Sequence, residues 1–156
     1  MPRVAIALGS NLGDRASLLG FGRSRLRTLL TDVLASSNYE TEPVGVTGHQ
    51  PLFLNAALVG ETSLTARALL SALLLIERDA GRERPFPGAA RTLDLDLLSY
   101  GDAIVDEPGL QVPHPGLRER RFVLEPLAEI APDLKDPVTG KTVAELLRRL
   151  SDKRHD

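Results

Sequence analysis

The chain contains the stretch Arg91-Thr92-Leu93-Asp94-Leu95-Asp96-Leu97-Leu98, in which leucine alternates with polar residues. Alternation with period two is typical of a β-strand, because successive side chains on a strand point to opposite faces. The leucines should therefore pack into a core, and the polar residues Thr92, Asp94 and Asp96 should share the other face. There the two carboxylates stand about 7 Å apart along the strand. Like charges this close need a positive partner, so the acidic face predicts a bound cation, with a divalent metal as first candidate.

Composition places the chain among ordinary globular proteins. Its 156 residues suffice for one domain with a real core, and 42% of them are hydrophobic and 26% charged. The net charge of −2 argues against a general nucleic-acid binder, and the lack of cysteine excludes disulfides and thiolate chemistry. No signal peptide or membrane-spanning run is recognisable. We expect one cytoplasmic domain over residues 1–156, an enzyme or a binding protein, monomeric and without a nucleic-acid or membrane partner.

Hydrophobic periodicity predicts strands alternating with helices. Strands are expected at residues 3–8, 33–39, 52–61 and 91–98, and helices at about 15–30 and 65–80. After the acidic strand, residues 100–103 fit a two-residue hairpin turn that returns over 103–105. An extended segment at 110–117, a short helical piece running to 131 and an amphipathic helix at about 142–150 complete the chain.

A glycine-rich loop from Gly9 to Asp14 joins the first strand to the first helix. Such a loop can cradle a phosphate at a helix N-terminus. Asn11 stands where the second glycine of the dinucleotide-binding motif belongs, so the pattern favours a structural turn over a phosphate site.

Phe53 and Asn55 share one face of the strand at 52–61. An aromatic plate beside an amide can stack on a flat heterocycle and read the hydrogen-bonding groups along its edge. The alternative is that Phe53 belongs to the core and Asn55 caps a bulge, and the pattern alone favours that alternative.

Two arginine clusters point to a polyphosphate ligand. The loop from Gly81 to Arg91 contains Arg82 and Arg84 and leads directly into the acidic strand. A metal can bridge carboxylates to phosphate while guanidinium groups hold the remaining oxygens. The alternative, in which these arginines pair with the two aspartates, leaves most of their bidentate donors unused. A second cluster later in the chain consists of Arg118, Arg120 and Arg121, and two clusters converging on one acidic strand fit a nucleoside triphosphate.

Two further titratable residues stand in unusual positions. Glu77 falls in the last turn of its predicted helix, where the helix dipole disfavours an anion, so we expect either a nearby cation or a solvated surface charge. His114 lies between Pro113 and Pro115, which fix the backbone around it. It is either a phosphate or metal contact or a buried structural donor.

Together these stretches resemble the 6-hydroxymethyl-7,8-dihydropterin pyrophosphokinases, a family of folate-pathway enzymes. The matching segments follow the family's order over nearly the whole chain: Gly9-Ser10-Asn11-Leu12-Gly13-Asp14, Tyr39-Glu40-Thr41-Glu42-Pro43-Val44-Gly45, Phe53-Leu54-Asn55-Ala56, Gly81-Arg82-Glu83-Arg84, Arg91-Thr92-Leu93-Asp94-Leu95-Asp96, and Val112-Pro113-His114 through Arg120-Arg121-Phe122. The resemblance implies an α+β fold of the ferredoxin-like type, an antiparallel sheet flanked by helices. It also implies transfer of pyrophosphate from ATP to the pterin hydroxymethyl group, with release of AMP.

The same resemblance assigns residues to a site. Two Mg²⁺ ions would sit on Asp94 and Asp96 and bridge the phosphates of the co-substrate ATP. Phe53 and Phe122 would sandwich the pterin, and Asn55 would read its edge. The other implied substrate contacts are Thr41, Pro43 and Val44. The implied ATP contacts are Glu77, Arg84, Arg91, Leu97, His114 and Arg120, and the implied catalytic residues are Arg82, Arg91, Asp94 and Asp96.

The chain departs from the family's pattern in two places. Many relatives have a tryptophan and a Gly-Pro pair shortly before the strand arginine, where this chain has Phe86-Pro87-Gly88-Ala89-Ala90. A lid contact by that tryptophan is therefore not implied, although Phe86 can partly replace it. Pro115 stands where some relatives have a tyrosine, so that contact is not implied either.

Two other functions compete with this interpretation. A two-metal nucleotidyltransferase also uses an Asp-x-Asp strand but releases pyrophosphate instead of AMP. A non-catalytic ligand-binding module on a ferredoxin-like fold predicts no Mg²⁺-dependent ATP binding and gives no reason for two arginine clusters.

Overall fold

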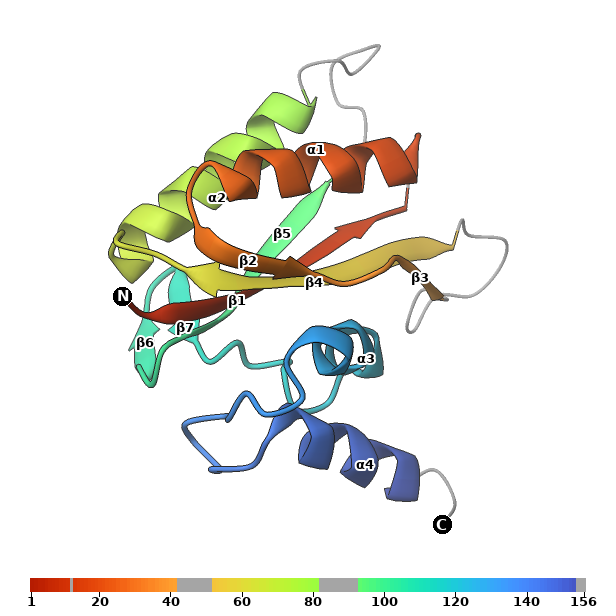
Figure 1. Cartoon of the computed structure of the whole chain (residues 1–156), viewed down its shortest axis with the longest axis vertical. Helices are drawn as coiled ribbons and strands as arrows, with labels where there is room; N and C mark the ends of the chain where they lie inside the picture. Colours follow the sequence, from red (N-terminus) through yellow and green to blue (C-terminus); the bar gives the residue numbers. More distant parts are fainter. Residues whose placement is uncertain (12, 42–51, 82–92, 154–156) are drawn as a thin grey trace.

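A central antiparallel sheet carries helices on both faces (Figure 1). The computed structural model describes residues 1–11, 13–41, 52–81 and 93–153. In chain order the elements are β1 (Arg3–Ser10), α1 (Arg15–Arg27), β2 (Thr31–Ala35), β3 (Tyr39–Thr41), β4 (Phe53–Glu61), α2 (Ala66–Ala80), β5 (Asp94–Tyr100), β6 (Val105–Glu107), β7 (Leu110–Val112), α3 (Arg121–Ile130) and α4 (Val143–Lys153). Among the described residues, the main sheet has five strands in the order β2-β4-β1-β5, with β3 also on β4, and its strand pairs are antiparallel. The predicted ferredoxin-like α+β fold is confirmed.

The first face of the sheet packs against α1 and α2. Val4, Ile6 and Leu8 of β1 alternate toward this face and are at most 1% exposed. The leucines of the acidic stretch join them, since Leu93, Leu95 and Leu97 belong to the same core and are at most 6% exposed. The inward leucine face predicted from period two is therefore confirmed.

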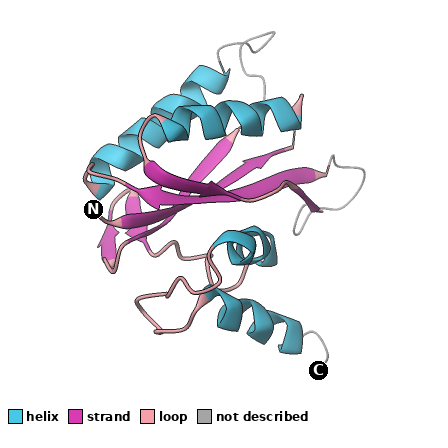
Figure 2. Cartoon of the chain, in the orientation of Figure 1, coloured by secondary structure: helices cyan, strands magenta, loops and turns pink. Residues whose placement is uncertain are grey.

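The second face of the sheet packs against α3, and α4 packs on α3 (Figure 2). Its core joins Ala57 and Val59 of β4 to Leu124 and Leu127 of α3. The helices thus form separate layers, with α1 and α2 on one side and α3 and α4 on the other. None of the helices in the described ranges is both long and apolar enough to cross a membrane.

The glycine-rich loop begins later than predicted. β1 continues to Ser10, so Gly9 is a strand residue paired on both sides rather than the first residue of a turn. Asp14 is the predicted N-cap of α1, and its carboxylate accepts a hydrogen bond from the Ser17 backbone N–H at 3.1 Å. That contact stabilises the helix start and agrees with a structural turn.

Two predicted strand features are wrong. The expected strand at 33–39 is split into β2 and β3 around Ser36, whose side-chain Oγ accepts the Ala57 N–H at 2.8 Å. A side chain in place of a backbone carbonyl at this point interrupts the regular ladder. The expected hairpin return at 103–105 is also absent from the described residues, because β6 pairs with β7 instead of β5. The Leu98 carbonyl of β5 instead accepts the backbone N–H of His114 at 2.8 Å.

Candidate active site

The acidic strand presents its carboxylates away from the leucine core. Asp94 and Asp96 are exposed, whereas the intervening Leu95 is buried, as the alternation predicts. Within the described ranges, no third His, Cys, Asp or Glu gathers with them into a group that could hold a metal. A metal bound here would take its other ligands from substrate oxygens and water, an arrangement that suits Mg²⁺.

Strand register places Asp94 in line with Asn55. β1 pairs Gly9 with Asn55 of β4 on one side and with Asp94 of β5 on the other. Residues directly paired in a sheet point to the same face, so the Asn55 and Asp94 side chains stand on either side of Gly9. Two strand spacings, about 10 Å, separate their backbones. The adjacent row contains Ala57, Ala7 and Asp96 in the same way.

Asn55 is held by the neighbouring edge strand. Its side chain is buried at 7% exposure, and Nδ2 donates a hydrogen bond to Thr41 Oγ1 at 2.5 Å. Thr41 pairs with Phe53, which is half-buried at the start of β4. Asn55 occurs in regular pairs with Gly9 and Tyr39, so it caps no bulge, and that part of the pattern-favoured alternative is wrong.

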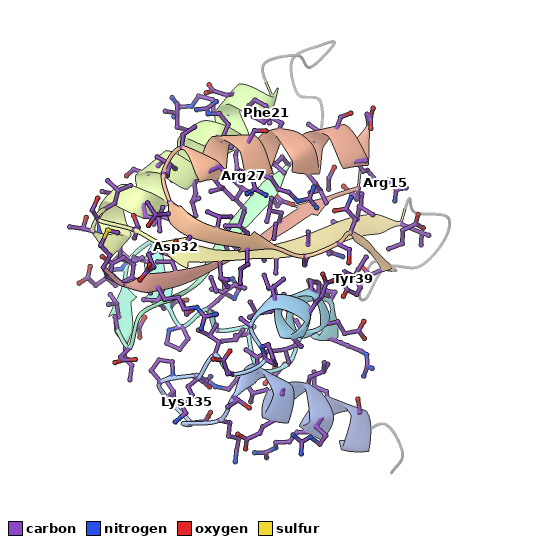
Figure 3. The ribbon with its side chains drawn as sticks, viewed as in Figure 1. Arg15, Phe21, Arg27, Asp32, Tyr39 and Lys135 are labelled. Atoms are coloured by element: carbon purple, nitrogen blue, oxygen red, sulfur yellow. The ribbon has the colours of Figure 1, made fainter. Side chains whose placement is uncertain are left out.

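A carboxylate on α3 anchors the strand that carries Thr41. Glu129 accepts hydrogen bonds from the Tyr39 hydroxyl at 2.6 Å and from the Ser37 backbone N–H and hydroxyl at 3.1 and 2.5 Å. Figure 3 shows Tyr39 beside α3. The hydrogen bonds from Ser37 and Tyr39 lower the pKa of Glu129, and the bond to Glu129 raises the pKa of Tyr39. Nothing in the sequence marks Glu129, because its partners lie far away along the chain.

Phe122 of α3 lies on the second face of the sheet, the face to which Asn55 and Asp94 point. It lies in the first turn of the helix and packs against the core between α3 and the sheet. Arg120, the N-cap residue, places its guanidinium carbon 5.9 Å from the Phe122 ring centroid, within cation–π range. Phe53 and Phe122 therefore belong to β4 and α3, two elements that pack against each other.

Glu77 lies inside the protein next to the acidic strand. It is 8% exposed, and its Oε2 accepts the Leu95 backbone N–H at 2.7 Å. The expected alternative of a solvated surface charge is therefore wrong. Among the strands that the structure describes, β5 ends the main sheet, and Glu77 supplies an acceptor to a backbone donor of this edge strand between Asp94 and Asp96.

His114 is oriented by two hydrogen bonds. Its backbone N–H donates to the Leu98 carbonyl at 2.8 Å, and its Nδ1 accepts the Gly116 N–H at 2.9 Å. Because Nδ1 is an acceptor, the neutral imidazole carries its proton on Nε2. Burial lowers the pKa of His114, with nearby Asp96 opposing and Arg120 adding to that effect. The side chain is thus a neutral donor held in one orientation.

His114 also lines an open hollow of about 280 Å³ beside the acidic strand. Asp96 and Leu97 contribute to the same hollow, so three predicted residues converge there. No pattern in the sequence selects the other lining residues, which are Leu70, Leu95, Gly109, Leu110, Gln111 and Pro115. Their contribution depends on how α2, β5 and β7 pack, which no local pattern reveals.

Five predicted site residues lie outside the described ranges: Pro43, Val44, Arg82, Arg84 and Arg91. Of the described members, Glu77 contacts the Leu95 backbone and Arg120 lies near the Phe122 ring. Seven others fall into two groups. Thr41, Phe53, Asn55 and Phe122 form one group near β3, β4 and α3, and Asp96, Leu97 and His114 form the other beside β5. Asp94 and Gly9 lie in the row between them.

Residues 5–132 match the model of the 7,8-dihydro-6-hydroxymethylpterin-pyrophosphokinase family. A 2-amino-4-hydroxy-6-hydroxymethyldihydropteridine pyrophosphokinase of Methylorubrum extorquens is 43% identical over 152 residues, which cover 96% of this chain and 94% of the relative. The enzyme of the same description from Pseudomonas aeruginosa is 42% identical over 150 residues, with coverages of 93% and 90%.

Solved structures with the same fold include wild-type HPPK-DHPS of Plasmodium falciparum. The superposition has a TM-score of 0.79 at 13% identity and covers 97% of this chain. This chain spans 45% of that longer protein. At this identity the likeness supports the fold alone.

Proposed function

The chain belongs to the 7,8-dihydro-6-hydroxymethylpterin-pyrophosphokinase family, and from this membership we propose how its residues divide the work of the reaction. It transfers pyrophosphate from ATP to the hydroxymethyl group of 6-hydroxymethyl-7,8-dihydropterin in folate biosynthesis. Loss of pyrophosphate from ATP leaves AMP. Family membership removes both competing functions, the nucleotidyltransferase and the non-catalytic module.

We propose that Asp94 and Asp96 hold two Mg²⁺ ions against the ATP phosphates. Their exposed carboxylates are hard oxygen donors on a strand fixed by the leucine core, and two protein ligands leave coordination positions for phosphate oxygens. Bound Mg²⁺ would neutralise phosphate charge and polarise the group being transferred.

The pterin end of the site would be formed by Phe53, Asn55 and Phe122. Asn55 is fixed by Thr41, so its amide is already oriented before a ligand arrives. An oriented amide can read the donors and acceptors along a pterin edge, and aromatic rings from β4 and α3 can cover its two faces. Pro43 and Val44, which lie outside the described ranges, complete this proposed group.

ATP would occupy the side of the site near His114. The hollow beside β5 combines apolar walls with Asp96 and His114, a mixture that suits a nucleoside. His114 would donate from Nε2 to an ATP oxygen without adding charge, and Arg120 would supply a cation to the phosphates. Arg84 and Arg91 are proposed as further phosphate ligands, Glu77 as an ATP contact and Arg82 as a catalytic residue.

The row formed by Asn55, Gly9 and Asp94 carries this proposal. It puts the residue whose amide would read the pterin in one row with the residue whose carboxylate would hold the phosphate end, on backbones about 10 Å apart. The pterin hydroxymethyl oxygen can then attack the β-phosphorus of ATP between them, and AMP departs on the opposite side. This reaction depends chiefly on alignment and charge neutralisation.

Replacing Asp94 with asparagine tests the site. With ATP, Mg²⁺ and the hydroxymethyl dihydropterin, the wild type should form AMP and the pterin diphosphate in equal amounts. Asp94→Asn should lower this turnover by about 100-fold or more, because a metal ligand is lost. Asp102→Asn makes the same change at an exposed turn after β5 and should retain normal turnover. Near-normal turnover of Asp94→Asn would refute the metal-binding role.

We also propose that the enzyme acts as a monomer. The large exposed apolar side chains include Leu34 of β2, Leu74 of α2 and Val138 before α4, which come from separate elements. Sedimentation equilibrium should therefore give the mass of one chain, and a concentration-dependent dimer would contradict the proposal.

A further inference from the structure

Gly9 occupies the middle position of the row that joins the two ends of the site. It lies inside β1, paired with Asn55 and with Asp94, and it is partly exposed. A side chain at this position would project between theirs, on the same face of the sheet. The Gly9 backbone therefore forms the surface of the sheet between the Asn55 and Asp94 side chains.

Backbone geometry does not account for a glycine at this position. Gly9 does not have the positive φ found at Gly13, Gly101, Gly109 and Gly140. A strand interior also disfavours glycine relative to alanine, because glycine loses more conformational freedom on folding. Local backbone preference would thus admit a residue with a side chain.

The limited room for a side chain at this position explains why the residue is glycine. A Cβ atom added at Gly9 would lie 3.2 Å from Oδ1 of Asn55. That separation is shorter than an ordinary van der Waals contact, so the Asn55 amide would have to move. Asn55 has little freedom to do so, because its Nδ2 is bonded to Thr41 and its side chain is buried.

We infer that Gly9 is a positioning and specificity residue, whose missing side chain keeps Asn55 oriented and leaves a passage for the hydroxymethyl group toward Asp94. This inference rests on the proposed function of the site. It gives the start of the Gly9–Asp14 segment a role that neither a turn nor a phosphate cradle provides.

The test compares Gly9→Ala with Gly60→Ala. Gly60 is another glycine inside a strand of the same sheet, in β4. A Cβ there would lie 3.1 Å from the Leu30 Cβ and the Thr31 carbonyl oxygen. It is five residues from Asn55 along β4, about 17 Å away. Gly60→Ala therefore introduces a similar steric conflict in the same sheet but outside the site.

For Gly9→Ala we expect kcat/KM for the pterin to fall by about 10-fold or more, because a small misplacement of reacting groups costs a large factor in rate. The Kd for ATP with Mg²⁺ should stay within about twofold, since Asp96 and His114 are not displaced. Gly60→Ala should lower the Tm and leave both kinetic constants near those of the wild type. An equal loss of pterin kcat/KM in Gly60→Ala would instead indicate general distortion of the sheet and overturn the inference.

The double variant Gly9→Ala/Asn55→Ala tests whether Gly9 acts through the Asn55 side chain, and it removes the conflict if Gly9→Ala alone does not fold. Gly9→Ala should then affect pterin KM less in the Asn55→Ala background than in the wild type. Additive effects would overturn the positioning role.

The failure of this inference can be told apart from failure of the proposed function. If Gly9→Ala retains wild-type pterin kcat/KM while Asn55→Ala and Asp94→Asn lose it, the role of Gly9 is refuted and the site stands. If all three variants retain it, the proposed site itself is refuted.

Discussion

Replacing Glu77 with alanine should destabilise the acidic strand in the absence of any ligand. The Glu77 carboxylate is 8% exposed and accepts the Leu95 N–H at 2.7 Å, at the outer edge of the sheet. Leu95 is itself 6% exposed, so water cannot readily replace the lost acceptor. The truncation would leave a buried backbone donor without this partner.

The size of the effect follows from that burial. A buried donor left without its acceptor costs about 1–3 kcal/mol, so we expect a loss of about 2 kcal/mol in the free energy of unfolding. For a chain of this length, each kcal/mol lowers the Tm by about 2–4 °C, which gives a shift of about 4–8 °C. Glu77→Gln keeps an acceptor oxygen but loses the charge, so its loss should be about half as large.

Thermal unfolding followed by circular dichroism, without ATP or Mg²⁺, measures this effect directly. The control is Glu119→Ala, which removes a carboxylate from an exposed residue and should leave the Tm unchanged. Because no ATP is present, a lower Tm cannot come from a lost ATP contact. A Tm for Glu77→Ala within about 1 °C of the wild type would refute the reasoning. In turnover assays, the Mg²⁺ concentration for half-maximal activity should rise, since the strand carrying Asp94 is less firmly held.

Three further variants test separate parts of the structure. Phe53→Ala should raise the KM for pterin about 10-fold, through lost stacking, and leave the Kd for ATP unchanged; equal losses in separate titrations would contradict the sandwich. Glu129→Ala should return the raised pKa of Tyr39 toward its ordinary value, which ultraviolet titration can follow because the chain has 2 tyrosines. Burial alone would raise the pKa of Asp136, but hydrogen bonds led by that from Arg118 outweigh it and lower the pKa. The carboxylate therefore stabilises the fold above about pH 4 and loses this contribution as the pH falls through its folded pKa. Asp136→Asn should unfold more readily at pH 7, and acid unfolding should show a smaller pH dependence.

The sequence predicted features that depend on neighbours along the chain. Period two was enough to place Leu93 and Leu95 in the core and Asp94 and Asp96 outside it, because the pleat alone sets those directions. The predicted return of the chain after Tyr100 failed for the opposite reason. Which strand the returning segment pairs with depends on competition for the β5 edge, and His114 forms a backbone hydrogen bond there.

Glu77 and Asn55 show why side-chain roles were harder to predict. Charge and helix position suggested either a cation or solvent near Glu77. The solvent alternative is wrong, because the carboxylate is buried and accepts a backbone N–H of another element. For Asn55, strand pattern favoured a bulge cap, whereas the regular pairing on both sides leaves its amide bonded to Thr41. In both cases the deciding partner comes from tertiary packing, which a single sequence does not specify.

The position of the site follows from the antiparallel pairing of β1 with both of its neighbours. Antiparallel strands bring the end of β1 beside the starts of β4 and β5, so Gly9 must meet residues near those starts, which are Asn55 and Asp94. The topology therefore determines which three backbone segments lie side by side, and their side chains determine the chemistry of the site. A carboxylate and an amide supply the chemistry at the two ends, and a glycine between them leaves the space in which the substrates can react. No local sequence pattern reveals this role of Gly9, because its neighbours in the sheet are remote along the chain.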